Sequence, residues 1–263
     1  MKLLKKCLAV AAVVSALGVT GSANATLTNW YVDTDGVGGN AATLVNDYLD
    51  LTGVAYAHNT FTSATTFTFK ESGLFETPTA DGPVNSGGTA LNPVLSAAFT
   101  GTGTGTTGGL LSFLTGSLTV TQGATTVGTF DLLSGSANLA AGTVLPNGAI
   151  SLIFQATSLT AGYFYDSGMV DLSTILASNP LVFGFATTNV IPLTRNVGAP
   201  LQNLYNATFD PDQLGVITPN NTTDLHLSNN GQFRLQVPEP GTLALFGISL
   251  LGIVGLRRRN ANA

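Results

Sequence analysis

The chain has 263 residues, a formal net charge of −5 and few charged side chains, which make up only 9% of the sequence. Between residues 26 and 237 three cations stand against thirteen acids, so this part carries a formal charge of −10. A surface of that sign repels the phosphate backbone, and we therefore exclude nucleic acid as a partner.

The first 25 residues have the three parts of a secretory signal peptide. Three lysines among the first six residues precede an apolar run, Leu8–Val19, and the small residues Ala23 and Ala25 supply a cleavage site. We predict that residues 1–25 are removed on export. The single cysteine, Cys7, leaves with them, so the remaining chain has no disulfide and no thiolate metal site.

Residues 26–237 are predicted to form one mainly β domain. Gly, Thr, Ser and Asn are abundant there, and several stretches alternate apolar and polar residues with the period of a strand. Phe67 and Phe69, for example, share one face, while Thr68 and Lys70 share the other. Similar rows lie at residues 118–120, 150–156, 181–185, 225–227 and 233–237. Short strands with Gly, Pro and Asn between them favour an antiparallel β-sandwich or a jelly roll.

Four segments are expected to differ from this strand pattern. Residues 40–50 begin at an Asn and space apolar side chains along one side, which predicts a short helix. Residues 170–178 predict a second helix, capped by Asp171 and ending before a proline. The run GTGTGTTGG at 101–109 is expected to be a mobile loop, because its glycines are costly to order. Residues 189–223 are expected to form a long irregular connection.

The most suggestive local motif is DTDGVGGN at residues 33–40. Asp33, Asp35 and Asn40 resemble part of a calcium-binding loop, in which oxygen ligands alternate and glycine permits a sharp bend. A full loop also needs a Glu as its twelfth residue, and Leu44 stands there instead. The alternative is a simple turn after a strand. Calcium is therefore the one cofactor that the sequence leaves open.

Candidate catalytic groups are scattered, and we expect no enzymatic activity. The two histidines, His58 and His226, have no metal-ligating neighbour at a suitable spacing, and no G-x-S-x-G motif supports a hydrolytic triad. Carboxylates that are close in sequence could serve a glycosidase only if the fold placed them across a glycosidic bond. These pairs are Glu71 with Glu76 and Asp210 with Asp212.

Aromatic residues offer one more way to contact a ligand. Trp30, Tyr31 and the run Tyr163-Phe164-Tyr165 could stack on sugar rings. Alternatively, they fill the core of a domain that has no disulfide to stabilise it. We expect the second role.

The C-terminal end has the three parts of a processing signal. Pro238, Glu239 and Pro240 hold the backbone extended and accessible. The segment from Leu243 to Leu256 is apolar, but its fourteen residues fall short of the roughly twenty that a stable membrane span needs. Three arginines follow: Arg257, Arg258 and Arg259. Because positive charges stay in the cytoplasm, we predict that this end holds the exported domain at the inner membrane. Because the apolar segment is short, we expect this anchoring to be only transient.

The order V-P-E-P-G-T, apolar segment and R-R-R closely resembles the PEP-CTERM sorting signal of Gram-negative bacteria. The resemblance assigns residues 238–263 to sorting. It implies that an exosortase, an integral-membrane transpeptidase-like enzyme, recognises Pro238, Glu239 and Pro240 and processes the chain near them. Proteins of this kind commonly accompany exopolysaccharide production. More loosely, NWYVDTDGVGGN, YLDLTG and FETPTADG are similar to the flocculation-associated subgroup.

These observations together predict a protein of the cell surface or extracellular matrix. Its expected partners are an exosortase, extracellular polysaccharide and, transiently, the inner membrane. Its expected role is in aggregation, flocculation or biofilm formation. The alternative is a calcium-assisted carbohydrate-binding module, and a secreted hydrolase is favoured less than either.

Overall fold

A computed structural model describes residues 24–26, 29–37, 42–178, 180–193, 199–209 and 222–238. Residues Thr26–Gln236 form one compact unit by their mutual contacts, and the description below concerns that unit. Ala25 lies in strand β1 (Asn24–Thr26), and Pro238 is the last residue of strand β12 (Asp224–Pro238). Several predicted features lie outside the described residues: Ala23, Asn40, the apolar segment 243–256, and the sorting residues Glu239, Pro240, Arg257, Arg258 and Arg259.

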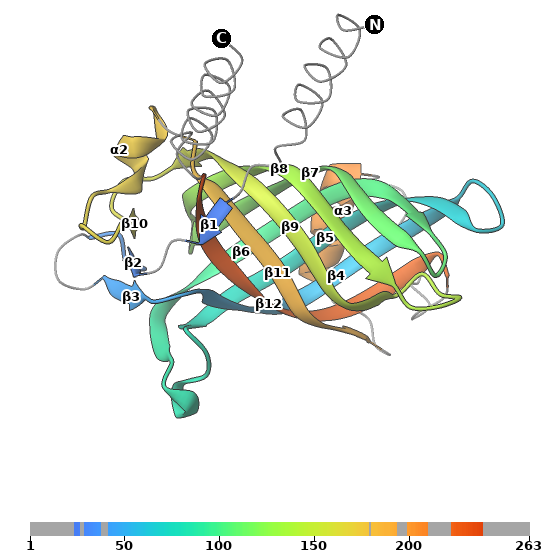
Figure 1. The fold of residues 1–263 in the computed structure, drawn as a ribbon, viewed down its shortest axis with the longest axis horizontal. Helices are drawn as coiled ribbons and strands as arrows, with labels where there is room; N and C mark the ends of the chain where they lie inside the picture. Colours follow the sequence, from blue (N-terminus) through green and yellow to red (C-terminus); the bar gives the residue numbers. More distant parts are fainter. Residues whose placement is uncertain are drawn as a thin grey trace, which may run out of the picture. The chain divides into compact units, whose positions relative to one another are not determined.

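Eight long strands of the described chain form a closed antiparallel sheet (Figure 1). They are β4 (Leu49–Phe61), β5 (Thr66–Ala80), β6 (Thr89–Thr106), β7 (Leu110–Gln122), β8 (Thr125–Leu139), β9 (Pro146–Leu159), β11 (Val182–Pro192) and β12. Each strand pairs with the next in this order, and β12 returns to pair with β4, which closes a barrel. The prediction of a mainly β domain is confirmed, but the sandwich or jelly roll is wrong.

The sequence pattern could not distinguish a sandwich from a barrel, because both produce the same alternation of apolar and polar residues. Alternation indicates that one face of a strand is buried, and this is equally true of a sandwich and a barrel. Here β4 to β9 pair consecutively, without the crossings between two sheets that a jelly roll requires. The strands are also long, up to 18 residues in β6. A long twisted meander of this kind can curl until its first and last strands meet.

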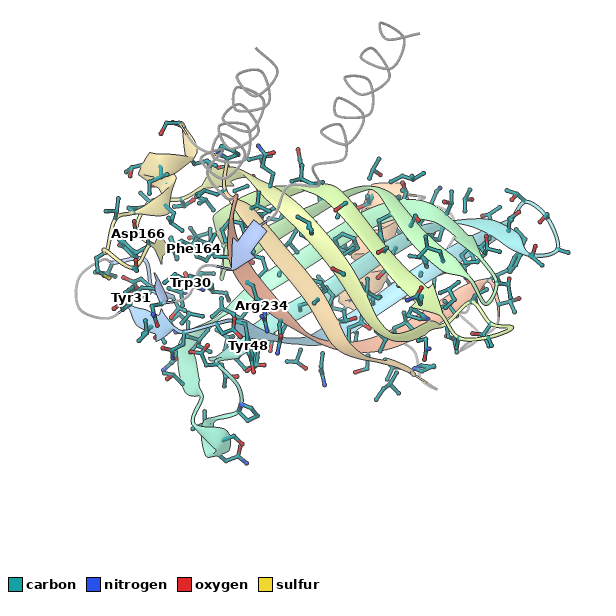
Figure 2. All side chains as sticks on the ribbon, viewed as in Figure 1. Trp30, Tyr31, Tyr48, Phe164, Asp166 and Arg234 are labelled. Carbon is teal, nitrogen blue, oxygen red and sulfur yellow. The ribbon has the colours of Figure 1, made fainter. Side chains whose placement is uncertain are left out.

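The buried side chains of a separate three-stranded sheet pack against the core of the barrel. The sheet contains β10 (Phe164–Tyr165), β2 (Trp30–Val32) and β3 (Thr43–Val45), in that order. The Trp30 ring is buried, and its centroid lies 6.2 Å from that of Phe164. Phe164 in turn lies 6.2 Å from Phe183 of β11. Figure 2 shows Trp30 and Phe164 near each other at the end of the domain that carries β2, β3 and β10.

The two predicted helices had opposite outcomes. Helix α2 (Leu172–Leu176) confirms the second, with Asp171 as its cap: Asp171 Oδ1 accepts a hydrogen bond of 2.9 Å from the backbone N–H of Ser173. The helix expected over residues 40–50 is wrong, because that segment contains β3 and the start of β4. Val45 pairs there with Trp30 and becomes buried, so cross-strand packing outweighs the helical spacing.

The remaining short elements lie in connections. The 3₁₀ turn η1 (Val84–Ser86) sits in the hairpin between β5 and β6. Helix α3 (Ala199–Phe209) packs Leu201 and Tyr205 against the outer face of the barrel, where the Tyr205 ring meets the Tyr56 ring edge-on at 4.7 Å. The irregular connection expected over 189–223 therefore contains the end of β11 and a helix. Within the described part of the chain, no helix combines the length and apolar character needed to cross a membrane.

Most of the glycine-rich run at 101–109 is strand, since residues 101–106 belong to β6 and only 107–109 form the turn before β7. Its glycines point into the barrel and its threonines point out. A Cβ atom on Gly101 would lie 2.6 Å from the Phe99 ring, and one on Gly103 would lie 2.5 Å from the Phe69 ring. Phenylalanine rings thus cover the inward glycines of β6. The prediction of a loop over residues 101–106 is wrong, because this ring packing offsets the entropy cost of ordering glycine in a strand.

Adding a methyl group beneath one of these rings is expected to destabilise the barrel. Gly105→Ala should lower the free energy of unfolding by about 1–3 kcal/mol, because the added Cβ atom would lie 2.3 Å from the Phe67 ring, which has to shift within a packed core. Thr104→Ala is the matched control, since Thr104 is the adjacent residue and is exposed. Denaturant titration of both variants measures the effect. Equal stability of the two variants would contradict this account of the core.

Candidate functional site

The barrel interior contains one carboxylic acid, Glu71, among the described residues that line it. The alternation of β5 places Glu71 in the same inward row as Phe69 and Phe75, and its side chain is 6% exposed. Its neighbours across the two adjacent strands are Ala57 on β4 and Gly101 on β6. Both are small, so they leave room for the longer acid in an otherwise apolar layer.

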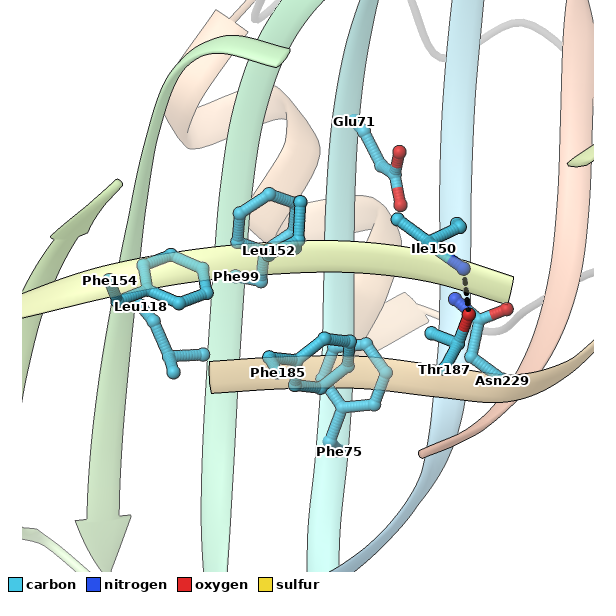
Figure 3. Close-up of a pocket in the computed structure, with 10 residues that line it drawn as sticks. All are labelled: Glu71, Phe75, Phe99, Leu118, Ile150, Leu152, Phe154, Phe185, Thr187 and Asn229. Atoms are coloured by element: carbon cyan, nitrogen blue, oxygen red, sulfur yellow. Dashed lines mark hydrogen bonds between the residues drawn. The ribbon is translucent and has the colours of Figure 1, made fainter. Parts of the chain in front are cut away.

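Two further polar side chains lie near Glu71, as Figure 3 shows. Thr187 Oγ1 accepts a hydrogen bond of 2.7 Å from the backbone N–H of Ile150. Asn229 is 2% exposed, and its Oδ1 has no hydrogen-bond partner among the described residues. About 10 Å³ of space remains between these side chains, which is the room that one water molecule needs. The cavity can therefore hydrate Glu71 and Asn229 but cannot admit a substrate.

Burial raises the pKa of Glu71 to about 8, because the apolar interior disfavours the charged form. The acid is therefore mostly protonated at neutral pH. A proton donor of this kind can serve as a general acid when a substrate reaches it. Since the cavity has room for only one water, the geometry assigns Glu71 a structural role.

A second polar cluster lies on the outer face, where β4 and β12 pair. Asp224 Oδ1 lies 2.9 Å from His58 Nδ1 and accepts a hydrogen bond of 2.7 Å from the Tyr56 hydroxyl. Thr223 Oγ1 donates to the other oxygen at 3.0 Å. Burial works against the charge of Asp224, but the hydrogen bonds from His58, Tyr56 and Thr223 outweigh it and lower the pKa of Asp224.

The strand register brings both histidines of the chain into this cluster. Asp224 pairs with His58, and His226 pairs with Tyr56. Burial lowers the pKa of His226, although the charge of Asp224 opposes the shift. A hydrolytic triad would also need a nucleophilic hydroxyl on the histidine, and no described hydroxyl is hydrogen-bonded to His58. The arrangement resembles a structural network more than a catalytic one.

The predicted calcium ligands Asp33 and Asp35 serve the turn in which they lie. Asp33 is buried, and its Oδ1 accepts hydrogen bonds from the backbone N–H groups of Asp35 and Gly36 at 3.2 and 3.3 Å. Asp35 Oδ1 accepts one from Val37 at 2.9 Å, and this bond and Asp33 lower the pKa of Asp35. No cluster of three His, Cys, Asp or Glu residues suited to a metal exists in the described chain. Calcium binding stays a prediction, since Asn40 lies outside the described residues.

Other aspartates hold turns in the same way, a role that the sequence analysis missed. Asp81 accepts hydrogen bonds from the backbone N–H groups of Asn46, Asp47 and Tyr48 at 2.7, 2.8 and 3.2 Å. Burial disfavours the charge of Asp81, but these bonds outweigh it and lower its pKa. Asp50, Asp166 and Asp171 accept from backbone N–H groups of nearby loops as well. Much of the negative charge therefore serves to fix turns.

The remaining predicted groups do not assemble into one site. Glu71 lies inside the barrel while Glu76 is exposed outside it, so the two carboxylates cannot act together. Asp210 and Asp212 lie outside the described residues. Among the aromatic candidates, Trp30, Tyr163 and Phe164 are buried in the core, which confirms the structural role expected for them. Tyr31 and Tyr165 are half-buried and pair across β2 and β10.

Glu71 gives the domain a characteristic dependence on pH. The folded protein keeps a proton that the unfolded chain releases near its ordinary pKa of 4.5, so the free energy of unfolding falls as pH rises from about 4.5 to about 8. Glu71→Gln removes this titration and should become more stable than the wild type by up to about 5 kcal/mol at pH 8, with little difference at pH 4.

Denaturant titrations of both proteins between pH 4 and pH 9 measure this difference. All other ionisable groups are the same in the two proteins, so their contributions cancel in the difference between the two free energies of unfolding. Glu76→Gln, which changes an exposed acid on the same strand, is the control and should show no such trend. A difference between wild type and Glu71→Gln that stays constant with pH would overturn the assignment.

Comparison with known protein families identifies the C-terminal signal. Residues 236–259 match the family model described as the PEP-CTERM protein-sorting motif. The match contains Pro238, Glu239 and Pro240 and extends to the three arginines. Neither the curated proteins nor the solved structures include a significant match to the chain. The chain therefore carries a PEP-CTERM sorting motif, which implies export, sorting to the surface of a Gram-negative cell and processing by an exosortase.

Proposed function

We propose that this protein is a non-enzymatic component of the cell surface or extracellular matrix. After export, its apolar C-terminal segment holds it briefly at the inner membrane. An exosortase then processes it near Pro238, Glu239 and Pro240, and the β domain is retained in extracellular polymer. There it contributes to flocculation or biofilm formation. The observation that carries this proposal is the sorting motif at residues 236–259.

The hydrogen bonds and the burial of the acidic side chains support a role without catalysis. Glu71 is enclosed in a cavity with room for about one water, and Asp33, Asp35 and Asp81 bind backbone N–H groups. Asp224 binds three neighbouring side chains. An acid or base for catalysis needs access to a substrate and a suitable partner. These described groups are committed to the fold instead.

The outer face of the barrel supports contact with hydrated polymer. Hydroxyl groups of adjacent strands pair there: Thr100 with Ser117 at 3.1 Å, Thr102 with Thr115 at 2.7 Å, and Thr129 with Thr157 at 2.9 Å. Such a face is polar without being strongly charged. It can exchange hydrogen bonds with a polyhydroxylated polymer and has little charge to bind anionic molecules.

The alternative, a calcium-assisted carbohydrate-binding module, depends on Asp33, Asp35 and Asn40. Calcium would have to compete with the backbone N–H groups that Asp33 and Asp35 now bind. Thermal melting of the protein with calcium or with a chelator distinguishes the alternatives. A melting temperature that is unchanged by the chelator would eliminate the calcium-assisted module, whereas a rise with calcium that Asp35→Asn abolishes would favour it.

Loss of the sorting signal is expected to change location without unfolding the domain. Glu239→Ala, or replacement of the three terminal arginines by Gln, should leave the protein in the membrane fraction and reduce cell aggregation. Deleting the exosortase gene in the host should have the same effect. Lys70→Gln is the control, since it removes a cation from the β domain. Cell fractionation and an aggregation assay report the outcome. Unchanged location in all these strains would refute the proposed route.

A further inference from the structure

We propose that a groove on the outer face of the barrel binds a short run of a neutral saccharide chain. This inference rests on the proposed function, which places the domain among extracellular polymers. The groove has a volume of about 530 Å³, within the range of small-molecule sites. Its lining comes from β4, β5, β6, β7 and β12, so the fold assembles it from segments far apart in the sequence.

The lining of the groove includes two hydroxyl groups that form no hydrogen bond within the described chain. Ser96 and Thr121 face each other across β6 and β7, yet neither side chain forms a hydrogen bond within the described chain. Further along the same two strands, Thr100 bonds to Ser117 and Thr102 bonds to Thr115. Thr52, another lining residue, already donates from its hydroxyl to Asn230 Oδ1 at 3.1 Å. The hydroxyls of Ser96 and Thr121 can donate to and accept from a ligand without breaking a bond within the described chain.

Charge and polarity narrow the class of ligand. Glu76 is the charged residue among the described lining residues, and it would repel an anionic sugar. A carboxylate accepts hydrogen bonds from hydroxyl groups, which a neutral sugar supplies in pairs. Val54, Leu74 and Ala98 add an apolar floor on which the C–H face of a sugar ring can lie. Hydroxyls, one acid and an apolar floor together suit a neutral polyhydroxylated chain.

An extended peptide fits this groove less well. Peptides commonly bind a sheet by adding a strand to an unpaired edge. Here β4, β5 and β6 each pair with a strand on both sides, so the groove exposes side chains and offers no free backbone edge. The aromatic residue Phe75 in its lining is only 4% exposed and provides no stacking platform. Binding to one groove is therefore expected to be weak, and a polymer would gain strength by contacting many copies.

The test is an NMR titration of the protein purified from the cell surface with three probes of similar length. They are cellohexaose, which is neutral, a hexamer of mannuronic acid, which is anionic, and hexalysine, which is a cationic peptide. Thr121→Val removes one hydroxyl from the groove, and Thr119→Val removes one from the same strand outside it. Glu76→Gln removes the acid, and Asp131→Asn removes an exposed acid elsewhere.

We expect cellohexaose to bind and the mannuronate hexamer not to bind. Thr121→Val and Glu76→Gln should each raise the Kd for cellohexaose by about three- to tenfold, as expected for the loss of one hydrogen bond to a ligand. The two control variants should remain within about twofold of the wild type. Since all four changes are at exposed or half-exposed positions, melting curves should show that each variant is folded.

Three results would overturn the proposal. They are no binding of cellohexaose, tighter binding of mannuronate or hexalysine than of cellohexaose, and equal loss of binding in the control and groove variants. None of these would alter where the protein is found in cells that lack the exosortase. The experiments can therefore refute saccharide binding by the groove without refuting the proposed sorting route, and the reverse.

Discussion

The packing of phenylalanine rings over inward glycines is the interaction on which the rest of the barrel depends. The chain has a single cysteine, Cys7, so the domain cannot form an internal disulfide and its stability must come from the core. Phe67 and Phe69 on β5 fill the space left by Gly105 and Gly103 on β6. Edge-to-face contacts such as Phe69 with Phe113, at 4.9 Å, extend this layer to β7. The rings thereby fill the interior and leave cavities of about water size.

Closure of the barrel also determines what the polar residues can do. The interior is apolar except at a few positions such as Glu71, Thr187 and Asn229, so the raised pKa of Glu71 follows directly from the fold. Most acids instead lie in the turns and stabilise them through backbone N–H groups. What remains for recognition is the outer face, where small hydroxyl side chains cover long strands. Many of the hydroxyl side chains therefore lie on the outside of the barrel, and most of the described acids in the turns stabilise the fold.

How far the sequence could predict this structure depends on whether a feature is local. The row of Phe67 and Phe69 and the Asp171 cap depend on neighbouring residues, and both were predictable. The strand at 101–106 depends on Phe69 and Phe99 covering its glycines, and the strand at 43–45 depends on Trp30. Such partners become visible only when the register is known. The sorting signal was predictable because it is a continuous stretch, whereas the groove combines residues of five strands.

We propose that both ends of the chain direct export and sorting and are then removed, which leaves the β domain at the cell surface. Intact-mass spectrometry of the protein released from the surface of wild-type cells tests it most directly. The account predicts a chain that begins at Thr26 and ends near Pro240, without the apolar segment or the three arginines. Any group attached on processing would appear as additional mass. A surface protein that retains Arg257 to Arg259 would contradict the account.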